Sequence, residues 1–350
     1  MKNNYPAGVS VIVCCFNSAS RIVQTLTALA NQRCDQKVPW EIIVVDNNCT
    51  DNTTVIVEQT WNDLKTTTDL RIVVEPSPGL ANAREKGISA AKFSIIVFCD
   101  DDNWLSENYL LSVFDILQSD SSIAACGGMG VPVFETEEPF WFYKYSEAFA
   151  LGSQEINEKN GRLLNLYGAG LAINKSILDE LKNGGFNQIL KGRTGENLSS
   201  AEDTELSYAF VLLGYRLYCA DDLKFFHYLP KERLTFDYLK KLFIAFGNDG
   251  PVRNLYNAYL NESLLHQLIK NWWFHFALSL FRLFKYMIFP PKKYGRSIYL
   301  GWSIAYIKQL LTLHKCYDKI KKQVESIKKI KSSAEVNNIA SKSTLYFETN

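Results

Sequence analysis

The sequence predicts an α/β fold whose central sheet is mainly parallel and carries helices on both faces. Short, continuous apolar runs alternate with segments of helical periodicity over the first 115 residues, which is typical of parallel strands joined by helices. Polar side chains follow the ends of several of these runs. Because ligands of such sheets bind at the carboxyl ends of the strands, a binding site along one sheet edge is expected.

Four apolar runs define the predicted strands of this first half. They are rich in Val and Ile, and each is bounded by polar or turn-forming residues, as buried strands are. The predicted strands are Val9–Phe16, Glu41–Val45, Leu70–Val74 and Ser94–Cys99.

Helices are predicted between these strands. The polar residues 17–20 can provide N-caps for a helix whose apolar residues recur at helical spacing over 22–30. A second, weakly patterned helix follows the polar stretch 46–53. Residues 76–79, which contain two prolines and a glycine, break the chain before a helix over Leu80–Ala91.

The pattern loosens after Ala124, but further elements can still be identified. In order, we expect a glycine-kinked strand over 125–134, an aromatic segment over 139–152, a strand running into a helix over 165–178, a helix over Ser200–Leu213 and a closing strand that ends at His227.

Composition and charge restrict the class of protein. With 47% hydrophobic and 21% charged residues in 350, the chain is predicted to fold. Lys270–Lys331 carries a balance of +12 and the remainder −11, which indicates contact with an anionic surface, either membrane or nucleic acid. The eight cysteines lack metal-site spacing, and the N-terminus lacks a signal-peptide pattern, so a reducing, cytoplasmic location is expected.

Three consecutive carboxylates, Asp100, Asp101 and Asp102, follow the fourth predicted strand. Such crowded charge is costly without a cation, and Mg²⁺ or Mn²⁺ binds carboxylates together with substrate phosphates. A solvated turn with a helix N-cap is the alternative. Asn17 and Asp46 end two other predicted strands, so polar groups from three segments would converge at one sheet edge. This convergence favours the cation site over the solvated turn.

Glu202 and Asp203 begin a predicted helix, with Ser199 or Ser200 as its N-cap. A positioned carboxylate can act as a general base, although acidic residues in a first helical turn are also favoured by the helix dipole. Glu205, one turn further on, would either support this pair or be solvated.

Three further features have both a functional and a structural interpretation. His227 is either a divalent-metal ligand or a structural residue at a strand end. Arg84 and Lys86 either contact phosphates or are solvated on a surface helix. Tyr167–Gly170 either lets the backbone approach closely or is only a kinked strand.

The ordered set of segments resembles the family 2 glycosyltransferases, which have the GT-A fold. The resemblance covers about residues 8–245 and rests on the order and spacing of VSVIVCCFN, EIIVVDNNCTDNT, PGLANAREKG, IIVFCDDDNWL, YGAGLAI and AEDTEL. Each segment is weak alone, but the ordered combination is specific. The resemblance implies a Rossmann-like sheet of the GT-A type.

The resemblance also implies roles for residues at matching positions. Asn17 lies in the first nucleotide-binding loop, and Asp46 would hydrogen-bond the nucleobase. Asp100 and Asp102 match the DxD pair. Asp100 would face the ribose, and Asp102 would ligate an Mn²⁺ or Mg²⁺ ion that bridges the diphosphate of the donor.

Asp203 resembles the catalytic base of inverting members of the family and stands beside Glu202. His227 falls where some GT-A enzymes place a further metal ligand. Arg84 and Asp101 complete the predicted nucleotide-binding set.

These roles predict a metal-dependent inverting transferase that moves a sugar from a nucleotide-diphosphate donor to a hydroxyl acceptor in cell-surface glycan assembly. Asp203 would take the acceptor proton, and the metal would stabilise the leaving diphosphate. The predicted domains are a catalytic domain over 1–245, divided near residue 125 into a nucleotide-sugar half and an acceptor half, a helical, basic and aromatic extension over 246–331, and a disordered tail over 332–350.

The C-terminal extension predicts contact with a membrane surface. Aromatic residues alternate with Lys and Arg over 264–289, and the uncharged runs are too short to span a bilayer. The alternative is that the apolar face packs on the catalytic domain or on a second subunit. The expected partners are the sugar donor, a glycan or lipid-linked acceptor and a membrane surface contacted through 264–331, without nucleic acid. This places the protein peripherally on the inner face of the plasma membrane.

Rival interpretations are a nucleotidyltransferase of related fold, a processive polysaccharide synthase and a non-catalytic, membrane-associated scaffold. The first usually has a glycine-rich loop after its first strand, whereas CCFNSASR has no glycine. The second needs membrane spans and a QxxRW motif, which are not found. The third does not explain why Asp46, Asp100, Asp102 and Asp203 occur together.

Overall fold

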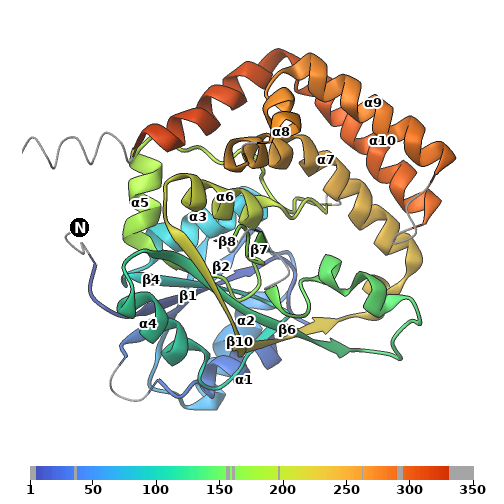
Figure 1. Ribbon diagram of the computed structural model, residues 1–350. Helices are drawn as coiled ribbons and strands as arrows, with labels where there is room; N and C mark the ends of the chain where they lie inside the picture. The colour runs from blue at the N-terminus through green and yellow to red at the C-terminus, as the bar shows by residue number, and fades with distance from the viewer. Residues whose placement is uncertain are drawn as a thin grey trace, which may run out of the picture.

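The computed structural model describes residues 5–34, 38–154, 158–159, 162–195, 198–261, 263–289 and 295–330. The tail predicted over 332–350 lies outside these residues. One sheet has helices on both faces, and a further group of helices lies beyond one of those faces (Figure 1).

Eight strands of the described residues form the main sheet, in the order β3-β2-β1-β4-β9-β6-β10-β5. They are β1 (Val9–Cys15), β2 (Trp40–Asp46), β3 (Asp69–Val74), β4 (Ile95–Asp100), β5 (Asn103–Leu105), β6 (Ile123–Phe134), β9 (Ala172–Asn174) and β10 (Arg216–Leu229). A separate hairpin pairs β7 (Glu158–Lys159) with β8 (Arg162–Leu163).

The strands of the first half are parallel, as predicted. β1 lies between β2 and β4, and β3 pairs with the outer side of β2. The observed bounds differ from the predicted ones by at most one residue at either end. The carboxyl ends of β1, β2 and β4 therefore meet at one edge of the sheet.

The second half adds antiparallel pairs, so the complete sheet is mixed. β9 runs antiparallel to β4 and β6, and β5 runs antiparallel to β10, while β6 and β10 are parallel. An antiparallel neighbour needs no crossover helix. This explains why the regular alternation of apolar runs and helices stops after the first half.

Helices cover both faces because alternate side chains of each strand point in opposite directions. Val11 and Val13 of β1 pack on the side of α1, α2 and α4, whereas Ile12 packs on the side of α3, α5 and α6. The helices are α1 (Ile22–Ala30), α2 (Thr53–Leu64), α3 (Leu80–Ala90), α4 (Tyr109–Ser119), α5 (Lys175–Asn183) and α6 (Glu202–Leu212).

The region after β10 is helical in its described part, as predicted. It consists of the 3₁₀ turn η4 (Lys231–Leu234), α7 (Phe236–Leu260), α8 (Leu264–Ile269), α9 (Trp272–Ile288), α10 (Arg296–Thr312), the turn η5 (His314–Cys316) and a helix over 317–330. In Figure 1 these helices arch over the side of the sheet that carries α6. A further 3₁₀ helix, η2 (Phe142–Phe149), follows β6.

Part of this helical region shares its core with the sheet. Leu255 of α7, Leu310 of α10 and Val324 of the last helix are buried in the same apolar cluster as Phe98 of β4. The domain limit predicted after residue 245 lies inside α7, which is one continuous helix.

Two predicted N-caps differ from the structure. α6 begins after Ala201, with no capping side chain, because Ser199 instead donates a hydrogen bond to Asp249 of α7 at 2.8 Å. α1 likewise has no side-chain cap, and the Ser18 hydroxyl donates to Asp101. Both serine hydroxyl groups are hydrogen-bonded to carboxylates far away in the sequence and so do not cap these helices.

Candidate active site

A cavity of about 670 Å³ opens at the carboxyl ends of β1 and β4. Its walls come from those strand ends, from the loops before α3 and α6, and from η2 and α7. Seven predicted site residues line it, namely Arg84, Asp100, Asp101, Asp102, Glu202, Asp203 and His227.

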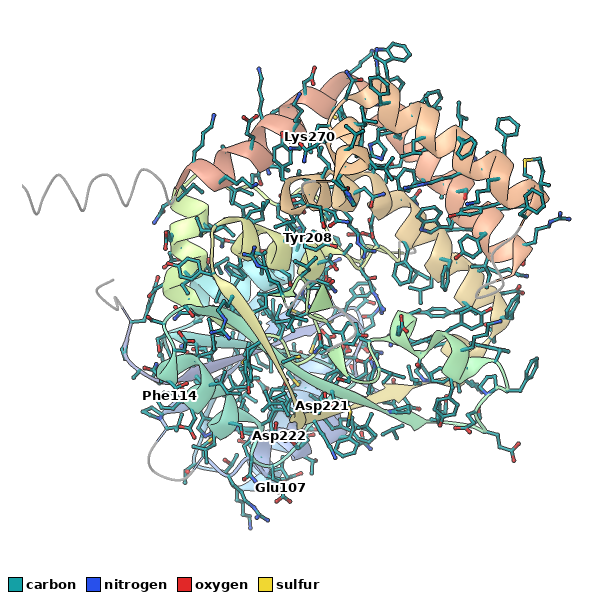
Figure 2. The ribbon with its side chains drawn as sticks, viewed as in Figure 1. Glu107, Phe114, Tyr208, Asp221, Asp222 and Lys270 are labelled. Carbon is teal, nitrogen blue, oxygen red and sulfur yellow. The ribbon has the colours of Figure 1, made fainter. Side chains whose placement is uncertain are left out.

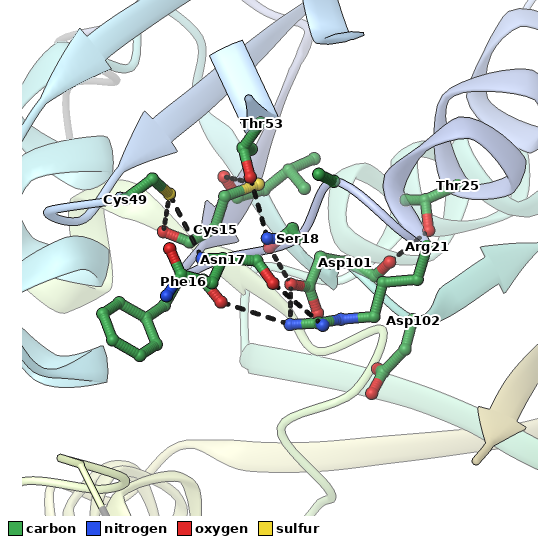
Figure 3. A network of polar contacts seen from close by, with 12 residues as sticks. Cys15, Phe16, Asn17, Ser18, Arg21, Thr25, Cys49, Thr53, Asp101 and Asp102 are labelled. Atoms are coloured by element: carbon green, nitrogen blue, oxygen red, sulfur yellow. Dashed lines mark hydrogen bonds and ion pairs between the residues drawn. The ribbon is translucent and has the colours of Figure 1, made fainter. Parts of the chain in front are cut away.

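The three consecutive carboxylates have separate environments. Asp101 is buried and accepts hydrogen bonds from Ser18 and, at 2.7 Å, from Arg21. Figure 3 shows the Asp102 carboxylate pointing away from this network. Burial and the neighbouring Asp102 raise the pKa of the Asp101 carboxyl. Asp101 therefore fixes the loop after β4 to the start of α1, although it also borders the cavity.

Asp102 lies beside His227 and Arg233. Arg233 Nη1 is 2.8 Å from Asp102 Oδ2, and His227 Nε2 is 3.7 Å from Asp102 Oδ1. Burial by itself would raise the pKa of the Asp102 carboxyl, but the guanidinium of Arg233 holds that pKa well below its usual range. Asp102 is consequently a buried carboxylate with its charge intact.

His227 presents a lone pair to the cavity. Its Nδ1 lies 2.9 Å from the Phe149 carbonyl oxygen, which can only accept, so Nδ1 carries the proton. Its Nε2 then accepts from Arg233 Nη1 at 3.3 Å. A neutral imidazole oriented through Nδ1 in this way is the form that binds metal ions.

The pair of Asp102 and His227 fits an Mn²⁺ or Mg²⁺ ion. One carboxylate oxygen and one imidazole nitrogen are suitable ligands, and a cation, the guanidinium of Arg233, already contacts both. Among the described residues no three acidic, His or Cys side chains gather as a metal cluster. Further ligands would have to come from water or from a diphosphate.

Arg84 is buried on α3 and joins two of the acidic groups. Its Nη1 lies 3.2 Å from Glu202 Oε1, and its Nη2 lies 3.9 Å from Asp100 Oδ1. The solvated alternative is therefore wrong for Arg84, whereas Lys86 is exposed. Burial raises the pKa of the Glu202 carboxyl to about 7, although Arg84 opposes the shift.

Asp203 is held by backbone groups. Its Oδ2 accepts from the Gly168 N–H at 2.5 Å, and its Oδ1 accepts from the Thr204 N–H at 2.5 Å. A Cβ added to Gly168 would stand 3.0 Å from Asp203 Oδ2 and 2.9 Å from Arg84 Nη2. The glycine thus allows the close backbone approach considered for 167–170. Burial raises the pKa of the Asp203 carboxyl.

Asn17 and Asp46 follow their strands as expected, but their side chains stabilise local turns. Asn17, at φ 51°, accepts a hydrogen bond from the Thr50 N–H at 2.8 Å, and Asp46 accepts from the Cys49 N–H at 2.8 Å. Their neighbours Phe16, Asn47 and Asn48 line the cavity. Asn17 and Asp46 are not among the described residues that line it.

Glu205 differs from both of its predicted alternatives. It is fully buried, and it accepts hydrogen bonds from the Ile189 and Leu190 N–H groups and from the Tyr256 hydroxyl. These hydrogen bonds join α6 to α7 and to the loop before α6. Glu205 is therefore neither solvated nor part of the cavity wall.

Several cavity residues were not predicted. The cations are Arg21, Lys144, Arg193, Arg233 and Arg253, and an aromatic wall consists of Tyr145, Phe149, Tyr238, Phe243 and Phe246. The available signals were the Arg that closes CCFNSASR, the Arg six residues after His227 in HYLPKERL, and the density of rings in PFWFYKYSEAF. None of these signals has a spacing that indicates a site.

Comparison with known proteins agrees with the fold. The family model described as Glycosyl transferase family 2 matches residues 10–182. The chain is 29% identical over 118 residues to the cholesterol galactosyltransferase of Borreliella burgdorferi, covering 34% of this chain and 31% of that relative. It is 25% identical over 122 residues to the poly-beta-1,6-N-acetyl-D-glucosamine synthase of Staphylococcus epidermidis, covering 35% and 28%. These alignments span less than a third of either relative.

A solved structure shares the fold over nearly the whole chain. The mannosyltransferase PcManGT from Pyrobaculum calidifontis, in complex with GDP-Man and Mn²⁺, aligns with a TM-score of 0.53 at 19% identity, covering 96% of this chain and 88% of that one. The architecture is accordingly of the GT-A type. Residues 10–182 belong to family 2 of the glycosyltransferases.

Proposed function

We propose that the chain is a metal-dependent inverting glycosyltransferase that transfers a sugar from a nucleotide-diphosphate donor to a hydroxyl group in cell-surface glycan assembly. The observation that carries this proposal is one cavity lined by both Asp102, beside His227, and Asp203. The cavity thus contains a cation-binding carboxylate and a separate candidate base. The name of the Staphylococcus epidermidis relative, a polysaccharide synthase, supports the choice of glycan assembly.

Asp203 has the features of a general base with a fixed orientation. Its two backbone hydrogen bonds hold the carboxylate in place, and its raised pKa makes it a stronger proton acceptor than an ordinary aspartate. It would remove the proton from the acceptor hydroxyl as the oxygen attacks the anomeric carbon. Inversion of configuration follows from a single displacement.

Asp102 and His227 would hold the metal, which supplies positive charge to the leaving diphosphate. Arg84, Asp100 and Asp101 border the same part of the cavity and are proposed to contact the nucleotide, together with Asn17 and Asp46 on the adjacent turns. Glu202 would keep Arg84 in position through their ion pair.

Substitution of Asp203 by Asn tests this proposal. Purified protein is incubated with Mn²⁺, a panel of UDP-, GDP- and CDP-sugars and extracted glycan and lipid acceptors, and release of the nucleoside diphosphate is followed. Asp203→Asn should lower the rate by about 10²–10⁴-fold, because the base is lost. Binding of the nucleotide should persist, since Asp203 does not belong to the proposed donor set.

A wild-type protein that binds nucleotide sugars but transfers none to any acceptor would favour the scaffold interpretation. Transfer of a nucleotidyl group from a nucleoside triphosphate would favour the nucleotidyltransferase interpretation. An Asp203→Asn variant as active as the wild type would remove Asp203 from the mechanism.

We also propose that the chain is peripheral on the cytoplasmic face of the plasma membrane and contacts anionic lipid through residues 264–331. No helix among the described residues has both the length and the apolar character that crossing a bilayer requires. One side of α9 is nevertheless apolar and exposed. Its most exposed rings there are Trp273 at 68%, Phe281 at 65% and Phe284 at 60%.

The basic side chains near this face complement anionic headgroups. Lys270 stands between α8 and α9, where Figure 2 labels it, and Lys285 is exposed on α9 itself. Aromatic rings beside lysines are typical of helices that lie in the headgroup region. A membrane position would also bring the protein to the surface that carries a lipid-linked acceptor.

Cosedimentation with vesicles that contain anionic lipid tests the membrane contact. The triple variant Trp273→Ser, Phe281→Ser, Phe284→Ser should lose most of its vesicle binding, and wild-type binding should weaken with salt. Phe140→Ser, which removes a ring that is 101% exposed outside this helix, is the matched control and should bind as the wild type does. Dimer formation through α9 without vesicle binding would identify a second subunit as the partner instead.

A further inference from the structure

Each of the three consecutive carboxylates has an arginine of its own. Arg84 pairs with Asp100, Arg21 with Asp101 and Arg233 with Asp102. These arginines come from α3, from the residue before α1 and from η4, respectively. The crowded negative charge is therefore compensated by side chains of the protein itself.

The three pairs differ in how firmly the arginine is held. Arg21 also donates to the Phe16 and Asn17 carbonyl oxygens, and Arg84 also pairs with the buried Glu202. The second partner of Arg233 is His227, whose Nε2 accepts from the guanidinium. Among the described residues, Arg233 therefore has one side-chain partner besides its carboxylate, whereas Arg21 has two additional hydrogen bonds and Arg84 has a second carboxylate.

The position of Arg233 is also that of the proposed metal. Its Nη1 lies 2.8 Å from Asp102 Oδ2 and 3.3 Å from His227 Nε2, so one nitrogen contacts both candidate metal ligands. The single lone pair of His227 Nε2 cannot serve a guanidinium and a divalent ion simultaneously. The side chains of Asp102 and His227 are only 6% and 10% exposed, so water cannot easily replace either cation.

We propose that Arg233 is the resident cation of this site, and that a divalent metal binds by displacing its guanidinium from Asp102 and His227. The inference rests on the proposed function only in taking these two residues as the metal ligands. Metal binding must then overcome the ion pair of Arg233, which lowers the affinity for metal alone. An arriving diphosphate provides oxygens for the metal and a new anionic partner for the displaced guanidinium, so metal and donor are expected to bind together.

Titration of the nucleotide-free protein with Mn²⁺, followed by electron paramagnetic resonance of the free ion, tests this inference. Arg233→Met should bind Mn²⁺ at least about tenfold more tightly than the wild type, because the competing cation is gone. The matched control is Arg216→Met on β10. It breaks an exposed pair with Asp120 and should leave the affinity for Mn²⁺ unchanged.

Thermal unfolding gives a second readout that does not depend on activity. Arg233→Met leaves the buried Asp102 charge unpaired, so its Tm should fall without metal and recover with Mn²⁺ by more than the wild-type Tm rises. If Arg233→Met does not fold with or without Mn²⁺, Arg233→Lys decides. A lysine has one charged centre and should compete less well, which places its Mn²⁺ affinity above that of the wild type.

Folded Arg233 variants with wild-type or weaker Mn²⁺ affinity would overturn the inference. A failure of the proposed metal site itself would be seen in another variant. If Asp102 does not hold the metal, Asp102→Asn would bind Mn²⁺ as well as the wild type does, whatever the behaviour of the Arg233 variants.

Discussion

Two carboxyl groups in the first turns of α6 are buried, and burial disfavours their charged forms. Burial raises the pKa values of Glu202 and Glu205 to about 7 each. Glu202 borders the cavity, where its Oε2 has no hydrogen-bond partner among the described residues, whereas Glu205 accepts hydrogen bonds from three donors inside the protein. The first carboxyl therefore belongs to the site and the second to the fold.

This burial predicts how stability depends on pH. A carboxyl whose pKa is higher in the folded state than in the unfolded state binds more protons when folded, so its contribution is most favourable at low pH and is lost as the pH rises. For Glu202 and Glu205 the loss runs from about pH 4.5 to about pH 7. The free energy of unfolding should fall across this range.

Glu205→Gln should make that fall less steep, by up to about 1.4 kcal/mol per pH unit, the limit for one titrating group. Urea unfolding at several pH values between 4.5 and 7.5 measures the slope. Glu180→Gln, which alters a partly buried carboxylate bonded to Tyr215, is a control with the same change of charge. Equal slopes for Glu205→Gln and the wild type would show that Glu205 does not titrate in this range.

Single residues were predictable where their chemistry is local to a motif. Asp102 follows strand β4, and Asp203 lies in the first turn of helix α6. Ligands of such sheets bind at the edge where these elements meet, and both residues line the cavity. Arg233 was not predictable, because its partner Asp102 is far away in sequence and lone arginines are common. The buried environment of Glu205 was missed for the same reason, since its acceptor role depends on a loop and on α7.

At the scale of elements, apolar runs predicted the parallel strands within one residue, because strands buried on both faces, as β1, β2 and β4 are, have nearly continuous apolar sequences. Capping was predicted less well. A serine before a helix can cap it, but Ser18 and Ser199 have tertiary carboxylate partners instead. Local propensity therefore located the helices and did not determine the bonds at their ends.

The crossing of α7 and α10 depends on a glycine. A Cβ added to Gly250 would stand 2.4 Å from Tyr306 Cδ2, and the Tyr306 hydroxyl is bonded to Asn254 and His275, so the ring cannot move freely. Gly250→Ala should therefore destabilise the protein by about 1–3 kcal/mol, the usual cost of overpacking. Thermal or urea unfolding measures this change.

Gly301→Ala is the matched control on the partner helix. Its added Cβ would stand 3.4 Å from Ile244 Cγ1, an ordinary contact, so the gain in helix propensity should leave stability unchanged or slightly higher. If both variants unfold alike, close packing at Gly250 is not what fixes this crossing.

At the scale of the whole molecule, the chain combines a GT-A sheet with helices that partly continue its core. α7, α10 and the helix over 317–330 pack against the side of the sheet that carries α6, and α7 together with η2 provides the aromatic wall of the cavity. The composition indicated a separate basic and aromatic extension, but it could not indicate this shared core, since core membership depends on which faces meet.

The central claim is that the cavity binds a nucleotide diphosphate together with a divalent metal at Asp102. Calorimetric titration with UDP, GDP and CDP, with and without Mn²⁺, on the wild type and on Asp102→Asn tests it most directly. We expect that one nucleotide binds, that Mn²⁺ strengthens its binding, and that the strengthening is lost in Asp102→Asn. Metal-independent binding of equal strength in both proteins, or no binding of any nucleotide, would show that Asp102 does not hold a metal beside a bound nucleotide.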